Sequence, residues 1–138
     1  MKSLPADKLV VNGGTLTQEE YWFNISIPVA PFSLDGETVT TSFELDRIDF
    51  GTQSITELAN NSFTFPVNPE QGFIDGSIYL ANAHSPADVT EIAFGPYDGS
   101  TILATITLRI LFSFEGHAFE DMDLVLNTPL RVAEQPGR

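Results

Sequence analysis

Residues 101–114, with the sequence TILATITLRILFSF, contain the most regular pattern in the chain. Apolar side chains fill every second position of this stretch, at Ile102, Ala104, Ile106, Leu108, Ile110, Phe112 and Phe114. Alternate side chains of a β-strand point to opposite faces of its sheet, so the pattern predicts a central strand with one face buried. Fully extended it would be roughly 46 Å long at about 3.3 Å per residue, which is long for a compact domain of this size. We therefore expect it to bend, to pass between two sheets, or to reach into a partner.

Shorter alternating patterns lie on both sides of this stretch. Residues 23–29 and 39–45 each place their odd-numbered apolar side chains on one face. After residue 45 the apolar positions move to Ile48 and Phe50, a change of phase that one extra residue in a strand produces. We therefore predict a β-bulge at Asp46 and Arg47. The remaining strands are expected at residues 63–67, 74–80, 89–94 and 121–126.

Glycine and proline mark the boundaries between these strands. Asn12-Gly13, Asp35-Gly36 and Asp98-Gly99 are typical of turns. Asp75-Gly76 interrupts an otherwise continuous strand over residues 72–81, where we predict a kink or bulge rather than a hairpin. One short helical turn is expected within residues 53–60, capped by Thr52 or Ser54.

These patterns together predict an all-β fold. About eight or nine strands with turns between them favour an antiparallel β-sandwich, with a small β-barrel as the alternative. At 138 residues, of which 42% are hydrophobic, the chain is long enough to bury one core, so we expect one domain over residues 1–138. Its ends, residues 1–8 and 132–138, are expected to be flexible.

The charge of the chain limits its partners. Nineteen acidic residues against six basic ones give a net charge of −13. Nucleic acids and anionic lipid surfaces require clustered Lys or Arg, so we expect neither as a partner. No segment has the length of a transmembrane helix, and the polar first eight residues lack the apolar core of a signal peptide, so we expect a soluble, cytoplasmic protein.

No signature of catalysis or of a cofactor is found. The chain has no cysteine, which excludes disulfides, thiolate metal sites and a cysteine nucleophile. It also lacks the G-x-S-x-G nucleophile elbow and the glycine-rich phosphate loop. We therefore expect no cofactor and favour a protein that is not an enzyme.

Three aromatic residues are the candidate partner-binding residues. If the apolar side chains of the neighbouring strands point inward, Trp22, Phe73 and Tyr79 point outward. Exposed Trp and Tyr side chains are frequent anchors of recognition surfaces. Cover by a loop or by a second subunit is the alternative explanation.

The segment from Glu115 to Asp123 is the densest cluster of ionisable side chains. Asp121 and Asp123 would point to the same side of a strand and are weak candidates for a calcium site. His117 beside these carboxylates could act as a general base. A solvent-exposed turn explains the same residues without any chemistry.

Three functions therefore remain open from the sequence. The first is a non-catalytic protein that recognises a protein partner, for which the negative charge favours a basic one, or that forms a subunit of an assembly. The second is a β-sandwich module that binds carbohydrate or calcium, so a glycan or small-molecule ligand stays open. The third is a carboxylate-based hydrolase that uses Glu115, His117, Asp121 and Asp123.

Overall fold

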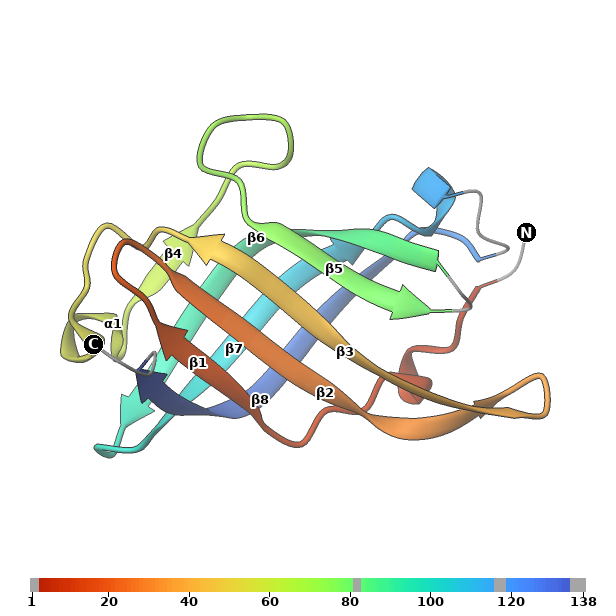
Figure 1. The fold of residues 1–138 in the computed structure, drawn as a ribbon, viewed down its shortest axis with the longest axis horizontal. Helices are drawn as coiled ribbons and strands as arrows, with labels where there is room; N and C mark the ends of the chain where they lie inside the picture. The colour runs from red at the N-terminus through yellow and green to blue at the C-terminus, as the bar shows by residue number, and fades with distance from the viewer. Residues whose placement is uncertain (1–2, 81–82, 116–118, 135–138) are drawn as a thin grey trace.

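The structure, a computed structural model, describes residues 3–80, 83–115 and 119–134. It is almost entirely β, as the sequence predicts (Figure 1). In chain order the elements are η1 (Ala6–Lys8), β1 (Gly14–Gln18), β2 (Phe23–Leu34), β3 (Glu37–Ile48), α1 (Ile55–Leu58), β4 (Ser62–Thr64), β5 (Asp75–Leu80), β6 (Ala83–Tyr97), β7 (Thr101–Ile110), η2 (Phe112–Glu115) and β8 (Met122–Glu134). None of the helices in these ranges is long and apolar enough to cross a membrane.

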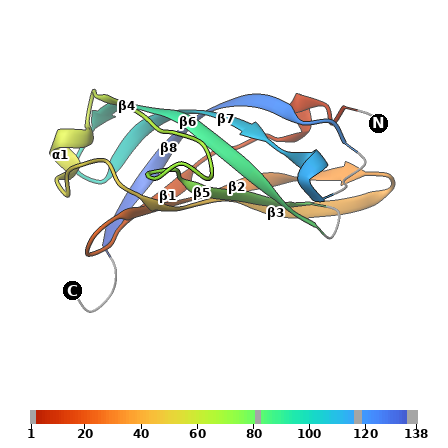
Figure 2. The ribbon, with the colours of Figure 1, turned by 90° about the horizontal axis from the view of Figure 1, so that it is seen from above.

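The strands form one sheet that closes on itself. Their order is β4-β6-β5-β3-β2-β1-β8-β7, and β6 also pairs with β7, so seven strands form a barrel and β4 is added beside β6. The small barrel is thus the architecture that the pairing forms. Figure 2 shows why a sandwich and this barrel resemble each other: the barrel is flattened, with β1, β2, β3 and β5 in one layer and β6, β7 and β8 in the other.

One pair of strands departs from the expected antiparallel arrangement. β1 runs parallel to β8, from Gly14 opposite Leu130 to Gln18 opposite Glu134, and this pairing completes the barrel wall. The sheet is therefore mixed. Alternation of side chains is the same in parallel and antiparallel strands, so the sequence pattern carries no information on this direction.

The strand predicted over residues 101–114 is correct up to Ile110 and wrong beyond it. The inward side chains of β7 from Ile102 to Ile110 are all buried. The chain then turns into η2, where Phe112 is fully buried against Phe119 at the end of the barrel, with ring centroids 5.7 Å apart, and Phe114 is 71% exposed. The predicted strand is therefore shortened by a turn after Ile110, which lets Phe112 cover the apolar end of the barrel.

The bulge predicted at Asp46 and Arg47 is confirmed. Phe23 pairs with Ile48 and Ile25 with Leu45, so β3 has one residue more than β2 over this interval. Arg47 takes the left-handed conformation, with φ +60°, and its N–H donates to the Asn24 side-chain oxygen at 2.9 Å. The bulge returns Ile48 to the interior, where it is fully buried.

The register is unbroken at Gly76, where the sequence predicts a kink or bulge. The register of β3 with β5 runs unbroken from Phe43 opposite Ile78 to Asp46 opposite Asp75. A Cβ atom on Gly76 would lie 2.4 Å from the carbonyl oxygen of Ala87. The glycine therefore allows a close approach of two backbones rather than a kink.

The last strand is longer than the predicted 121–126. β8 continues to Glu134, and Pro129 within it fits its position. The N–H of Val132 donates to Ser100 on the β7 side at 2.9 Å, so the N–H groups of residues 129 and 131 face β1. Since β1 pairs only from Leu130 onward, the missing N–H of Pro129 leaves no ladder bond unmade.

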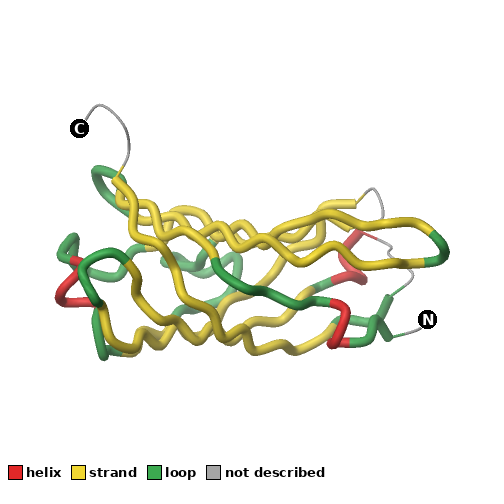
Figure 3. The backbone as a smooth tube through the Cα atoms, turned by 90° about the horizontal axis from the view of Figure 1, so that it is seen from below, coloured by secondary structure: helices red, strands yellow, loops and turns green. Residues whose placement is uncertain are grey.

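The two ends of the barrel are covered by apolar side chains. Rings of Phe23, Phe50, Phe63 and Phe94 pack edge to face near α1, with centroids 4.9 to 6.1 Å apart. α1 lies within the predicted helical turn, and Ser54 is at its N-cap position. Figure 3 shows the helical segments in red at opposite ends of the barrel.

Both chain ends, whose flexibility stays a prediction from the sequence, make contacts in the described part of the chain. Leu4 is buried, and residues 6–8 form η1. Residues 132–134 pair with β1. Residues 135–138 lie outside the described ranges.

Candidate functional site

A groove of about 400 Å³ opens on the outside of the barrel, where segment 65–74 lies next to β3, β5 and β6 (Figure 1). We call it the acidic groove. It is bordered by Phe114 of η2 as well. The residues that line it are Asp46, Asn68, Phe73, Ile74, Asp75, Gly76, Ser77, His84, Ser85, Pro86, Ala87, Asp88 and Phe114.

Three carboxylates from three strands meet at this groove. Asp46 at the end of β3 and Asp75 at the start of β5 are cross-strand partners, so their side chains leave the same face of the sheet. Asp88 comes from β6. In the described part of the chain none of the three forms an ion pair. The groove thus carries negative charge that no neighbouring Lys or Arg neutralises by contact.

Two of these carboxylates have perturbed pKa values. Partial burial raises the pKa of Asp46, and the nearby carboxylates of Asp75 and Glu44 raise it further, whereas Arg47 acts in the opposite direction. Partial burial also raises the pKa of Asp88. Ionised Asp46 and Asp88 are therefore less favourable in this surface than in water, and a bound cation would relieve that cost.

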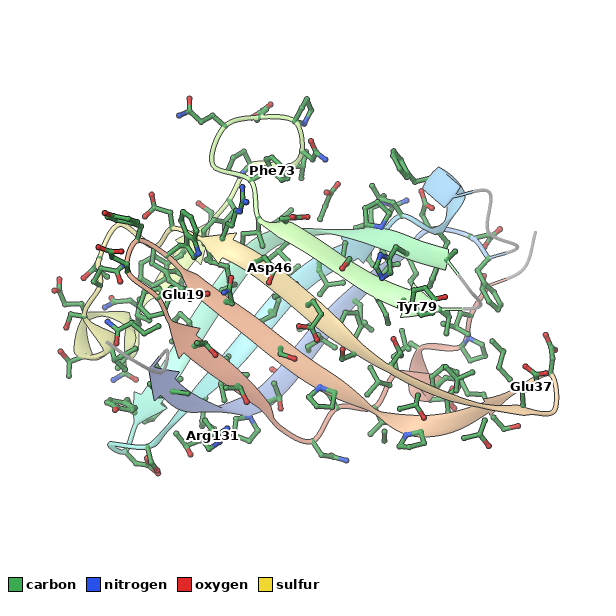
Figure 4. All side chains as sticks on the ribbon, in the orientation of Figure 1. Glu19, Glu37, Asp46, Phe73, Tyr79 and Arg131 are labelled. Atoms are coloured by element: carbon green, nitrogen blue, oxygen red, sulfur yellow. The ribbon has the colours of Figure 1, made fainter. Side chains whose placement is uncertain are left out.

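Aromatic rings border the same groove. Phe73 is half-buried at the base of segment 65–74, and Phe114 is largely exposed. Tyr79, which is 49% exposed, contacts the ring of His84 edge-on, with centroids 4.9 Å apart, and His84 lines the groove. Figure 4 shows Phe73, Asp46 and Tyr79 along the same side of the molecule.

Trp22 lies outside the groove, next to it. It follows Tyr21 in the turn between β1 and β2, and the two rings are 6.4 Å apart. The Arg47 guanidinium lies 5.6 Å from the Trp22 ring centre, a cation–π distance. Since Arg47 is adjacent to Asp46, Trp22 extends the surface beyond the groove. The structure therefore places Phe73 in the groove, Tyr79 in contact with His84 of its lining, and Trp22 outside the lining.

The acidic surface continues over β2 and β3. Glu44 accepts hydrogen bonds from the hydroxyls of Ser26 and Ser42, at 2.7 and 2.6 Å. Glu19, beside the Trp22 turn, accepts a hydrogen bond from the Asn24 side chain. These neighbours hold the two carboxylates on the outer face of the sheet without neutralising their charge.

Asp121 and Asp123 do not converge on a common point. Asp121 accepts hydrogen bonds from the backbone and the hydroxyl of Ser113, at 2.8 and 3.0 Å, and these bonds lower the pKa of Asp121. Asp123 forms an ion pair with Arg109 at 2.9 Å. His117 lies outside the described residues, as does the side chain of Glu115. Within the described ranges no group of three or more His, Asp or Glu side chains is arranged to hold a metal ion.

Comparisons with known proteins give no information on function, so the groove is the main evidence for it. No family model matches the chain, and no curated protein or solved structure shows significant similarity to it.

The groove combines carboxylates with aromatic rings, the two groups that bind ammonium and guanidinium ions. A carboxylate accepts charge-assisted hydrogen bonds from Lys or Arg, and the face of an aromatic ring attracts the same cations. Sequence reasoning missed the three aspartates because they lie far apart in the chain. The signal that could have found two of them is that Asp46 lies at the predicted bulge and Asp75 at the first outward position of a predicted strand.

Proposed function

We propose that this protein is a non-catalytic binding protein that recognises a basic segment of a protein partner through the acidic groove. The observation that carries the proposal is the groove itself, in which three carboxylates without ion-pair partners in the described structure lie beside Phe73 and Phe114. A Lys or Arg side chain would fit the groove by placing its charge near the aspartates and its aliphatic stem against the rings.

The charge of the whole chain supports a basic partner. With a net charge of −13, the protein attracts positively charged molecules at long range, which accelerates their association. The exposed rings of Tyr21 and Trp22, 70% and 37% exposed, provide area for a protein contact beside the groove.

Fluorescence anisotropy of labelled short oligolysine and oligoarginine peptides tests this proposal. We expect both peptides to bind at low salt and to dissociate as the salt concentration rises. Asp46→Asn/Asp75→Asn removes two charges from the groove and should weaken binding by about tenfold, from two contacts of roughly 0.7 kcal/mol each.

The matched control is Asp35→Asn/Glu37→Gln. It removes two charges as well, but from the β2–β3 hairpin, at the end of the molecule away from the groove (Figure 4). Retained binding in this control, with weakened binding in the groove variant, supports the proposal. Equal loss in both variants would show that only net charge matters and would overturn it.

A cytoplasmic location, which the sequence predicts, belongs to the same proposal.

Because the chain has one tryptophan, Trp22, its fluorescence provides a second, label-free signal of binding next to the groove. Basic peptides that bind elsewhere on the barrel would leave the Trp22 emission unchanged.

A further inference from the structure

The outward face of β7 and β8 lies on the layer opposite the one that carries Glu44 and Asp46 (Figure 2). Two large apolar side chains are half exposed there, Leu103 at 50% and Val125 at 53%. Leu103 is paired with Pro129 across the two strands, and Thr105 with Asn127, whose side chains form a 2.8 Å hydrogen bond. We call these outward side chains of β7 and β8 the β7–β8 face. Its middle carries no charge.

The charges of the β7–β8 face are separated at its two ends. One end has Arg109 in its ion pair with Asp123, and Asp88 of β6 is the cross-strand partner of Arg109 on the other side. The other end has Arg131, which has no ion-pair partner in the described part of the chain. With Asp88 counted, one end has one more carboxylate than guanidinium, and at the other end Arg131 supplies a guanidinium.

The charged residues at the two ends of β8 lie at equal distances from its middle. Asp123 and Arg131 lie four residues before and four residues after Asn127, so both face outward, roughly 26 Å apart at about 3.3 Å per residue. If a second copy packs on this face with its strands antiparallel and the two-fold axis over Asn127, Arg131 of each copy lies over Asp123 of the other. A two-fold interface brings the same surface together from both copies, so a face must complement itself in this way.

The negative end also has space for an incoming side chain. A hollow of about 320 Å³ lies there, lined by Asp88, Arg109, Asp123, Val67 and Val125 among others, with Arg109 paired with Asp123. Its aspartates match a guanidinium and its valines match the aliphatic stem of an arginine. Burial raises the pKa of Asp88, which agrees with a carboxylate at the margin of this hollow.

We propose that the protein forms a symmetric homodimer through the β7–β8 face, in which Arg131 of each copy enters the hollow beside Asp123 of the other. The dimer does not rest on the proposed function, since neither Arg131 nor Asp123 lines the acidic groove, although Asp88 borders both the groove and the hollow. Because the face is narrow, we expect weak association, with a dissociation constant on the order of 10–100 μM.

Sedimentation velocity over a concentration series tests the dimer with two charge reversals. Arg131→Glu places like negative charges at both contacts, and Asp123→Lys places like positive charges there. Each variant alone should have a dissociation constant raised by roughly 100-fold. Mixed in equal amounts, the two variants should form a heterodimer. The introduced glutamate of one copy then meets the introduced lysine of the other, and at the second contact the original Asp123 meets the original Arg131.

The control is Glu37→Lys, which changes net charge by the same amount as Asp123→Lys but lies on the β2–β3 hairpin. It should dimerise like the original chain. Circular dichroism and thermal unfolding of each variant establish that the fold is retained.

Two results would overturn the proposal. One is an original chain that stays monomeric up to about 1 mM, well above the expected dissociation constant. The other is a dimer that both charge reversals leave intact, which would place the contact on a different surface.

Discussion

Asp46 and Asp75 lie directly opposite each other on β3 and β5, on the outer face of the sheet. Partial burial raises the pKa of Asp46, and repulsion from the like charge at this cross-strand position raises it further. A pair of this kind reduces the stability of the fold when it is ionised. Its presence at the margin of a groove with aromatic walls is the basis of the binding function proposed above.

Asp46→Asn should stabilise the protein at neutral pH. Because the pKa of Asp46 is raised in the folded state, the folded state binds the proton more tightly than the unfolded state. Stability therefore falls as pH rises from the ordinary carboxyl range through the raised pKa. The variant lacks this loss, so we expect its melting temperature to exceed that of the original chain by about 1–3 °C at pH 7.

Thermal unfolding followed by circular dichroism at several pH values measures this gain. Near pH 3 the Asp46 carboxyl is protonated in both the folded and the unfolded state, so the gain should disappear there. A gain of equal size at pH 3 and pH 7 would show that charge is not its cause.

Ser85→Ala should also increase stability, for a different reason. Ser85 is fully buried, opposite Ile78 in the barrel interior, and its hydroxyl oxygen has no hydrogen-bond partner among the described residues. A buried hydroxyl without a partner costs free energy that an alanine avoids, so we expect a gain of about 1 kcal/mol in the free energy of unfolding. Urea denaturation measures it.

Ser26→Ala is the matched comparison, because Ser26 donates to Glu44 at 2.7 Å. Losing this partly buried hydrogen bond should cost about 0.5–1 kcal/mol. The prediction for Ser85 is contradicted if its substitution lowers stability as that of Ser26 does, since its hydroxyl would then have a partner in solution.

Ile106→Ala should destabilise the barrel strongly. Ile106 is fully buried in the middle of β7, between Ile92 of β6 and Leu126 of β8. Removing three carbon atoms there leaves a cavity that the closed wall cannot fill, at a cost of about 2–5 kcal/mol. Leu103→Ala on the same strand removes a half-exposed side chain and should cost less than about 1 kcal/mol. Equal effects in urea denaturation would contradict the assignment of the two faces of β7.

Gly76→Ala should destabilise the protein, although it adds a methyl group and removes no existing contact. The added methyl group would lie 2.4 Å from the Ala87 carbonyl oxygen and 3.1 Å from a methyl group of Leu45. Relief requires β5 and β6 to separate, so we expect a loss of roughly 2–4 kcal/mol. Gly36→Ala is the comparison: its φ of +83° also disfavours a side chain, but the added methyl group meets no atom within 4 Å. It should cost about 1 kcal/mol, and the reverse order in urea denaturation would contradict the close approach.

The sequence predicts some features well because they depend on local periodicity. The bulge at Asp46 and Arg47 is visible as a change in the phase of apolar residues, since burial requires Ile48 to return to the interior. The end of β7 is not visible in this way. Phe112 and Phe114 continue the alternation of the strand, yet the chain turns after Ile110 so that Phe112 covers the barrel end. Periodicity records which side chains are buried and not which element buries them.

In the candidate site, too, some features follow from local periodicity and others depend on which strands are neighbours. Tyr79 is outward because Ile78 and Leu80 are buried on either side of it, so its exposure follows from the sequence. Its contact with His84 depends on the pairing of β5 with β6. The meeting of Asp46, Asp75 and Asp88 requires three strands to be neighbours, and no local pattern specifies that order.

By itself the sequence determined the all-β class, the inward faces of most strands, the excess of negative charge and the absence of cysteine chemistry, because each depends on composition or on side chains two residues apart. Only the tertiary structure decided that the sheet closes as a mixed barrel and that Asp46, Asp75 and Asp88 share a groove. It also decided that Asp123 and Arg131 stand at opposite ends of one face. Strand order and closure arise from long-range packing and backbone hydrogen bonding, to which residues far apart in the chain contribute together.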